Sequence, residues 1–246
     1  MLQKLFRIVL DLLFPIARHC IFCWRKTEGT RGSLCADCAA QILQYGDENE
    51  ACPRCGRFIA AGCCPNCFDW PPEMLARVVS VVPYDGIYKD KIFDLKYNGQ
   101  EGLASRLGYL MARKAKALLP LDKDMLTVPV PLHGLREDER GYNQSALLAK
   151  AVAGELSLVY EDKALERIRY DCSQTALGRC ERRANMDGVF TVKNTALLAG
   201  KKVLLVDDII TTGATMLAAA AALKAAGVQE IYGLTWAAGF DKVKKN

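Results

Sequence analysis

Two adjacent carboxylates and a hydroxyl-rich turn are the residues of this chain best suited to chemistry. Asp207 and Asp208 follow the apolar run 203–206, which has the length and composition of a central parallel strand covered on both faces. Ligands of open α/β sheets bind at the carboxyl ends of such strands. Residues 211–215, Thr-Thr-Gly-Ala-Thr, offer hydroxyls and backbone N–H groups for a phosphate at a helix start. Because paired acids repel a bare phosphate, we expect them to accept hydrogen bonds from the cis-diol of a ribose.

The segment 203–215 resembles the phosphoribosyl pyrophosphate (PRPP) signature of type I phosphoribosyltransferases in its strand, its acid pair and its T-T-G-x-T turn. The resemblance implies that Asp207 and Asp208 are the catalytic, ribose-binding residues. It implies a phosphate cradle made of Thr211, Thr212, Gly213, Ala214 and Thr215. The alternative is a structural strand–turn–helix with an acidic N-cap.

Cysteines near the start of the chain form a second group of reactive side chains. Nine of the eleven lie between Cys20 and Cys67, and eight of these form pairs spaced so that both sulfurs reach one ion. The predicted ligands are Cys20, Cys23, Cys35, Cys38, Cys52, Cys55, Cys64 and Cys67. They suffice for two structural Zn²⁺ sites, with Cys63 as the alternative to Cys64. Residues 19–69 have few other apolar side chains, so the metals must hold them together.

Two other cysteine chemistries stay open, because thiolate spacing does not fix the metal. They are an iron–sulfur cluster and, in an oxidising compartment, disulfides. Zinc ligation by eight thiolates lowers the formal net charge from +5 to about +1. A broad basic surface for DNA is therefore not expected, although Arg54 and Arg57 are local candidates for phosphate contacts.

Arginines follow a second predicted strand. Pro129 and Pro131 stiffen a loop ahead of Arg136 and Arg140, whose forked donors suit a diphosphate. His133 in this loop is expected to be a satisfied loop residue, with a catalytic role as the alternative.

A long, polar, irregular stretch at 167–183 favours an active-site lid that brings positive charge over a leaving pyrophosphate. Arg182 and Arg183 in it are predicted to bind substrate. The alternative is a solvated helical surface over residues 175–186.

The elements that position these groups alternate between strands and helices. Strands are predicted at 78–84, 125–132, 158–161, 190–192, 203–206 and 230–236, and helices at 101–119, 143–156 and 215–226. This order predicts a mostly parallel α/β sheet with right-handed crossovers and helices on both faces. The fold class is thus α/β, with a type I phosphoribosyltransferase-like sheet preceded by a small Cys-rich double zinc ribbon.

Three segments are expected: an amphipathic helix over 1–18, the double zinc ribbon over 19–70, and the phosphoribosyltransferase-like domain over 71–246. With 246 residues, about half of them apolar, the chain is long enough for a substantial core. It has no apolar run long enough to span a membrane. A membrane-surface role for the first helix is the alternative.

Taken together, these motifs resemble the ComF family, bacterial phosphoribosyltransferase-like proteins with an N-terminal double zinc ribbon. The resemblance is carried by the four cysteine pairs and by residues 95–99, 129–133, 140–144, 174–185 and 206–215. Tyr142 stands where phenylalanine is also common in the family. The resemblance places Lys96 and Tyr97 beside the pocket and implies that Mg²⁺ bridges pyrophosphate and ribose oxygens.

Two functions follow from the resemblance. The first is a cytoplasmic PRPP-binding protein acting in natural competence and DNA uptake, with Mg²⁺-dependent phosphoribosyl transfer to an unknown acceptor as a possible enzymatic activity. The alternative is a non-catalytic adaptor that senses PRPP and uses the ribbon to contact single-stranded DNA or a partner protein. Arg54, Arg57 and Trp24 are the candidate contacts for that adaptor, since an exposed aromatic stacks on bases. In a third reading the ribbon only stabilises the fold.

Overall fold

The computed structural model describes residues 19–27, 33–45, 51–59, 64, 66–169 and 188–241. The predicted helix over 1–18, Cys63, and Arg182 and Arg183 lie outside this range. The chain divides into two compact units, Met1–Gln41 and Ile42–Asn246. The first four predicted cysteine ligands therefore belong to one unit, and the other four belong to the unit that contains the sheet.

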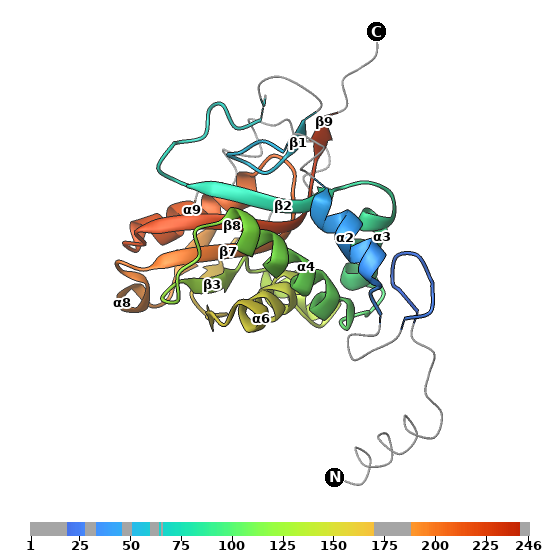
Figure 1. The fold of residues 1–246 in the computed structure, drawn as a ribbon. Coiled ribbons are helices and arrows are strands. Elements are labelled where there is room, and N and C mark those ends of the chain that lie inside the picture. The colour runs from blue at the N-terminus through green and yellow to red at the C-terminus, as the bar shows by residue number, and fades with distance from the viewer. Residues whose placement is uncertain are drawn as a thin grey trace. The chain divides into compact units, whose positions relative to one another are not determined.

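Five parallel strands form the main sheet, in the order β2-β8-β7-β3-β4 (Figure 1). Their bounds are β2 Arg77–Pro83, β3 Leu126–Pro129, β4 Val159–Tyr160, β7 Lys202–Ile210 and β8 Glu230–Ala238. The strand of this sheet that comes last in the chain, β8, lies between β2 and β7. The predicted parallel α/β sheet is confirmed.

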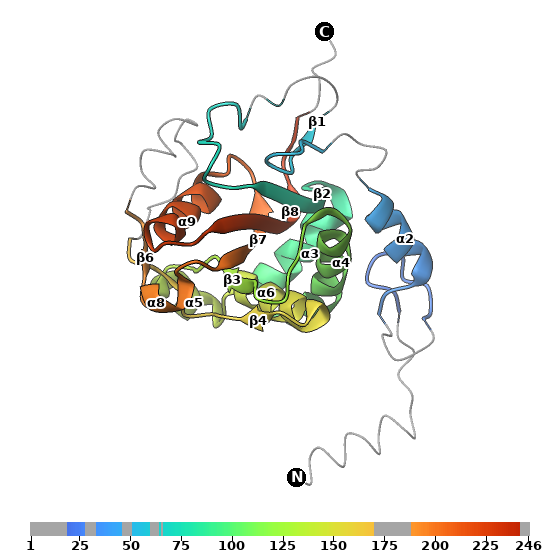
Figure 2. The same ribbon diagram turned by 60° about the vertical axis from the view of Figure 1, so that its left-hand side comes forward.

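Helices cover both faces of this sheet (Figures 1 and 2). On one face α9 (Ala214–Ala225) packs against β7, and on the other α4 (Leu103–Leu118) and α6 (Gln144–Leu156) pack against the strands and each other. Asn143 caps α6 by accepting hydrogen bonds from the N–H groups of Ser145 and Ala146, as expected of Asn at an N-cap. These three helices lie within about two residues of their predicted positions.

The structure departs from the predictions in several elements. The strand at Phe190–Val192 (β6) pairs antiparallel with β5 (Leu165–Arg167) in a separate two-stranded sheet. Two helices that the sequence did not predict, α3 (Gly86–Tyr97) and α5 (Gly134–Arg140), flank the candidate site. Neither has a clear apolar face: α3 buries only Ile92 and Leu95, and α5 buries no residue. Periodicity therefore gave little signal for them.

Four short elements complete the described chain. They are α2 (Ala36–Gln44), β1 (Phe58–Ile59), α8 (Thr195–Leu198) and β9 (Phe240–Asp241). The parallel pair of β1 with β9 ties the residues after the third cysteine pair to the end of β8.

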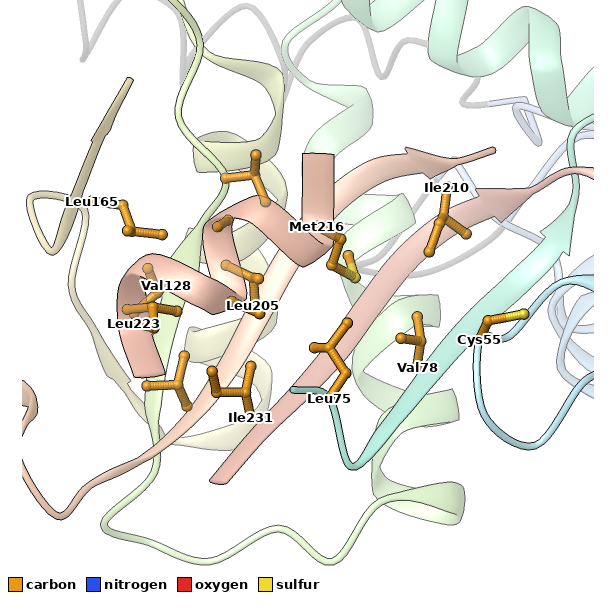
Figure 3. Close-up of a cluster of buried hydrophobic side chains, with 14 of the residues drawn as sticks. Cys55, Leu75, Val78, Val128, Leu165, Leu205, Ile210, Met216, Leu223 and Ile231 are labelled. Atoms are coloured by element: carbon orange, nitrogen blue, oxygen red, sulfur yellow. The ribbon is translucent and has the colours of Figure 1, made fainter. Parts of the chain in front are cut away.

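One buried cluster joins the sheet to the second set of cysteines. Leu205, Met216 and Val78 lie in it together with Cys55 (Figure 3). Phe58 belongs to the same cluster, and Cys55 and Phe58 are fully buried. The second cysteine set is therefore part of the core of this unit.

Packing of α4 on α6 supplies a test of the fold. A methyl group at Gly108 would lie 2.5 Å from Ala151 Cβ, so Gly108→Ala is expected to lower the free energy of unfolding by about 1–3 kcal/mol. Gly154→Ala in α6 is the matched control, since a Cβ there meets nothing within 4 Å. It should be neutral or stabilising by up to about 1 kcal/mol. Equal urea midpoints for the two variants would contradict the packing.

Candidate functional site

The acid pair lies within β7, which runs four residues beyond the predicted end of the strand. Ser145 at the start of α6 donates a hydrogen bond from Oγ to Asp207 Oδ1 at 2.8 Å. Asp208 is buried and forms an ion pair with Lys96, whose Nζ lies 2.8 Å from Oδ2. Two helices thus supply one polar partner to each carboxylate.

The two acids are adjacent in β7, yet their partners come from helices on the same side of the sheet. A regular strand directs neighbouring side chains to opposite faces of a sheet. Leu205 and Ile210, five residues apart, nevertheless belong to the same buried cluster. The partners of Asp207 and Asp208 come from α6 and α3, which both pack against α4. Both acids are therefore served from the same side of the sheet, as a shared ligand requires.

The surroundings of the pair shift the pKa values of Asp207 and Lys96. Burial, with the neighbouring Asp208, raises the pKa of Asp207 to about 7, although the Ser145 hydrogen bond opposes this. Burial alone would lower the pKa of Lys96, but the Asp208 carboxylate outweighs it and the pKa is raised. Near neutral pH, Asp207 is therefore poised between its two forms.

The predicted phosphate turn follows β7 and opens α9. Gly213 has φ +79° and is the N-cap of the helix without a side chain to cap it. The first helical N–H, of Ala214, reaches Thr212 Oγ1 only at 3.4 Å. Thr211 is exposed, and Thr212 and Thr215 are partly so. Helix N–H groups with open hydroxyls beside them suit an anion.

Residues 140–145 hold the site together in a way that sequence spacing did not reveal. Gly141 ends α5 in the left-handed region (φ +82°), and the Tyr142 hydroxyl then donates to the Leu95 carbonyl, which fixes the end of α3. Arg140 donates to Gln144 Oε1 and lies 5.0 Å from the centre of the Tyr97 ring. The motif therefore fixes Lys96 and Ser145 relative to each other.

A cavity of about 530 Å³ opens beside the acid pair. Its lining is formed by Lys96, Tyr97, Gly99, Arg136, Glu139, Arg140 and Tyr142. Lys96 pairs with Asp208 and also lines this cavity, so it links the acid pair to a space with basic and aromatic walls. Both arginines of the predicted diphosphate site line it.

Two residues differ from or add to the sequence analysis. His133 caps α5 by accepting a hydrogen bond from the Leu135 N–H at 3.3 Å, which fits a satisfied loop residue. Ser145 was not predicted as a site residue. Its only sequence signal is its place two residues after an N-cap Asn, which brings its side chain to the helix end that faces the sheet edge.

The two cysteine clusters form as predicted from the spacing. Within each cluster the ligand atoms all lie within 4.8 Å of one another, with Cys23 and Cys35 Sγ 3.6 Å apart and Cys52 and Cys67 Sγ 3.5 Å apart. A disulfide requires about 2.05 Å, whereas a tetrahedral ion with Zn–S bonds of about 2.3 Å separates its sulfurs by about 3.8 Å. All eight described cysteines are free, and each cluster fits a single ion.

Electrostatics in the second cluster also call for a cation. Burial and the neighbouring sulfurs of Cys52 and Cys64 raise the pKa of the Cys55 thiol. Four thiolates this close therefore need a positive ion among them, which Zn²⁺ would supply. Cys64 is the member that completes this set.

Arg54 and Arg57, the candidate contacts for nucleic-acid phosphates, are engaged within the protein. Arg57 is only 8% exposed and donates to the Thr211 carbonyl. Arg54 donates to the Cys67 carbonyl at 2.9 Å and to the Trp70 carbonyl. Both guanidinium groups therefore donate to backbone carbonyls of the same unit. Trp24, by contrast, is 75% exposed.

Comparison with known proteins finds a known domain in the part of the chain that contains the acid pair. The profile of the phosphoribosyl transferase domain matches residues 139–242, which include the acid pair and the turn. The chain is therefore one of the proteins that contain a phosphoribosyltransferase domain. Among solved structures, the chain is similar to glutamine PRPP amidotransferase from Bacillus subtilis. The match covers 54% of this chain and 26% of that protein's chain, with 21% sequence identity and a TM-score of 0.37.

Curated relatives define the family. Competence protein F of Haemophilus influenzae is 30% identical over 221 residues, which cover 87% of this chain and 93% of the relative. DNA utilization protein YhgH of Escherichia coli K12 is 30% identical over 173 residues, or 67% of this chain and 74% of the relative. The chain belongs to the competence protein F (ComF) family.

None of the helices in the described part of the chain has both the length and the apolar character needed to cross a membrane.

The raised pKa of Asp207 predicts a pH-dependent cost to stability. A carboxyl with a higher pKa in the folded state loses stability as pH rises from about 4 to about 7. Asp207→Asn should therefore raise the free energy of unfolding at pH 8 by up to about 4 kcal/mol, and by less at pH 6. Urea titrations with saturating zinc measure this. A change in stability that is the same at pH 6 and pH 8 would refute the assignment.

The clusters predict two zinc ions per chain, one for each set of four sulfurs. Elemental mass spectrometry should find Cys38→Ser and Cys67→Ser each lacking one ion, because a three-thiolate site binds zinc more weakly. Bound iron, or a full zinc complement in both variants, would contradict the assignment.

Proposed function

We propose that this protein binds PRPP with Mg²⁺ at the acid pair and the 211–215 turn, and that it acts in natural competence and DNA uptake in the cytoplasm. One observation carries the proposal. The acid pair has its partners on one side of the sheet, and an uncapped helix start directly follows the same strand. Paired carboxylates suit the ribose hydroxyls and the helix start suits the 5′-phosphate.

The cavity supports a place for the pyrophosphate. Arg136, Arg140 and Lys96 line it, and arginine forks suit phosphate oxygens. Arg182 and Arg183 remain predicted to join them from the lid. Mg²⁺ is proposed to accompany PRPP, because the donors here are carboxylate and phosphate oxygens. When bound, it lowers the charge on the leaving pyrophosphate.

Phosphoribosyl transfer is proposed as the reaction. Departure of pyrophosphate leaves positive charge at the anomeric carbon, and an amine or ring nitrogen of the acceptor attacks there. The protein's part is to hold the sugar and stabilise charge on the leaving group. Asp207 and Asp208 orient the ribose, and the arginines of the cavity hold the pyrophosphate.

The role in DNA uptake rests on the relatives, which are named for competence and for DNA utilization. An adaptor function of the ribbon is the second candidate, favoured by one observation. Trp24 follows Cys23, Phe68 follows Cys67, and both aromatic side chains are largely exposed, as stacking on single-stranded bases requires. The anisotropy of a fluorescent single strand bound to the protein should fall with rising salt. Trp24→Ala should bind the strand more weakly than the wild type does. If anisotropy does not rise when protein is added at low ionic strength, the proposed contact with single-stranded DNA is wrong.

Calorimetric titration with PRPP and Mg²⁺ tests the main proposal. The wild type should bind one PRPP per chain, and Asp207→Asn and Asp208→Asn should each weaken binding at least about tenfold, the equivalent of one charge-assisted hydrogen bond. Asp90→Asn, on the exposed side of α3, should bind as the wild type does. No wild-type binding, or equal affinity in all variants, would refute the site. Release of pyrophosphate in single turnovers with candidate bases or amines then tests transfer.

A further inference from the structure

Arg57 joins the second cysteine cluster to the phosphate turn. Its backbone carbonyl accepts the Cys52 N–H at 2.7 Å, which closes the loop between the third pair of cysteines. Its buried side chain donates to the Thr211 carbonyl. A Cβ at Gly239 would lie 3.0 Å from the guanidinium. The side chain is therefore enclosed, and a shift of the loop would move the turn with it.

Trp70 makes a second contact from the same cluster to the same turn. The ring is 3% exposed, and a Cβ at Gly213 would lie 2.1 Å from Cζ2. Only glycine therefore allows the ring so close to the turn. Arg54 holds the backbone of this segment through the Cys67 and Trp70 carbonyls. The ring thus supports the turn from the side of the cysteines.

Peptide geometry shows what the Arg57 hydrogen bond does. In a planar trans peptide the carbonyl and the following N–H point in opposite directions. With the Thr211 carbonyl held towards Arg57, the Thr212 N–H points away from the cluster. The guanidinium thereby fixes the orientation of an amide at the place where an anion would bind.

We propose that Arg57 and Trp70 are positioning residues for the phosphate turn, so that the second cysteine cluster is part of the scaffold of the sugar-phosphate site. This inference rests on the proposed function for its effect on PRPP affinity. Its structural part, an ordered turn in the free protein, does not. The first cluster belongs to the other compact unit and has no part in this role.

Amide hydrogen exchange in the ligand-free, zinc-loaded protein tests the structural part. Arg57→Ala should speed exchange at residues 212–217 about tenfold, the equivalent of one charge-assisted hydrogen bond. Arg57→Lys should have a smaller effect, because it keeps the charge but lacks the fork. Trp70→Ala should act like Arg57→Ala. Trp70→Phe should act less, because it keeps an apolar ring.

Arg25→Ala is the matched control, because Arg25 forms an exposed ion pair with Asp37 in the other unit. It should leave exchange at the turn and PRPP affinity unchanged. PRPP titration of the same variants should show about a tenfold loss for Arg57→Ala and Trp70→Ala. Zinc content measured on each variant identifies any that misfold, and Arg57→Lys and Trp70→Phe then carry the comparison.

The outcomes separate the two proposals. If the wild type does not bind PRPP but the turn loosens in Arg57→Ala, the proposed function fails and the positioning role stands. If the wild type binds PRPP and the zinc-loaded Arg57 and Trp70 variants exchange and bind as the wild type does, the positioning role is wrong and the PRPP site stands.

Discussion

Two carboxylates side by side at a buried strand end are the constraint around which this site is built. Each ionised acid disfavours ionisation of the other, and burial adds to that cost. One cation and one hydroxyl offset part of this cost: Lys96 pairs with Asp208, and Ser145 donates a hydrogen bond to Asp207. These two contacts do not fully offset burial and the neighbouring acid, because the pKa of Asp207 is still raised to about 7. A retained, incompletely compensated charge in a protein core is characteristic of a functional site.

The rest of the unit follows from the need to place these two partners. Lys96 stands near the end of α3, and the Tyr142 hydroxyl fixes that end through the Leu95 carbonyl. Ser145 is placed by the start of α6, which Asn143 caps. The segment 140–145 thus acts on both carboxylates at once. On the other side, the second cysteine cluster reaches the turn after the same strand through Arg57 and Trp70.

The sequence was sufficient for the parts of the structure that depend on local pattern. Apolar runs and helical periodicity predicted the parallel sheet and α4, α6 and α9, and cysteine spacing predicted both clusters. It was insufficient where long-range contacts decide. Helices α3 and α5 lack a strong apolar face, so periodicity had little to detect. Arg57 carries a charge that suggests exposure, yet its partner, the Thr211 carbonyl, is 154 residues away in the chain. The residues next to Arg57 in the sequence do not predict such a long-range hydrogen bond. The same is true of the hydrogen bond from Ser145 to Asp207.

A crystal structure of the zinc-loaded protein with PRPP and Mg²⁺ tests the central claim most directly. The account predicts the ribose hydroxyls within hydrogen-bond distance of Asp207 and Asp208, with the 5′-phosphate on the N–H groups of residues 211–215. PRPP bound elsewhere, with the acid pair and the turn still empty, would contradict it.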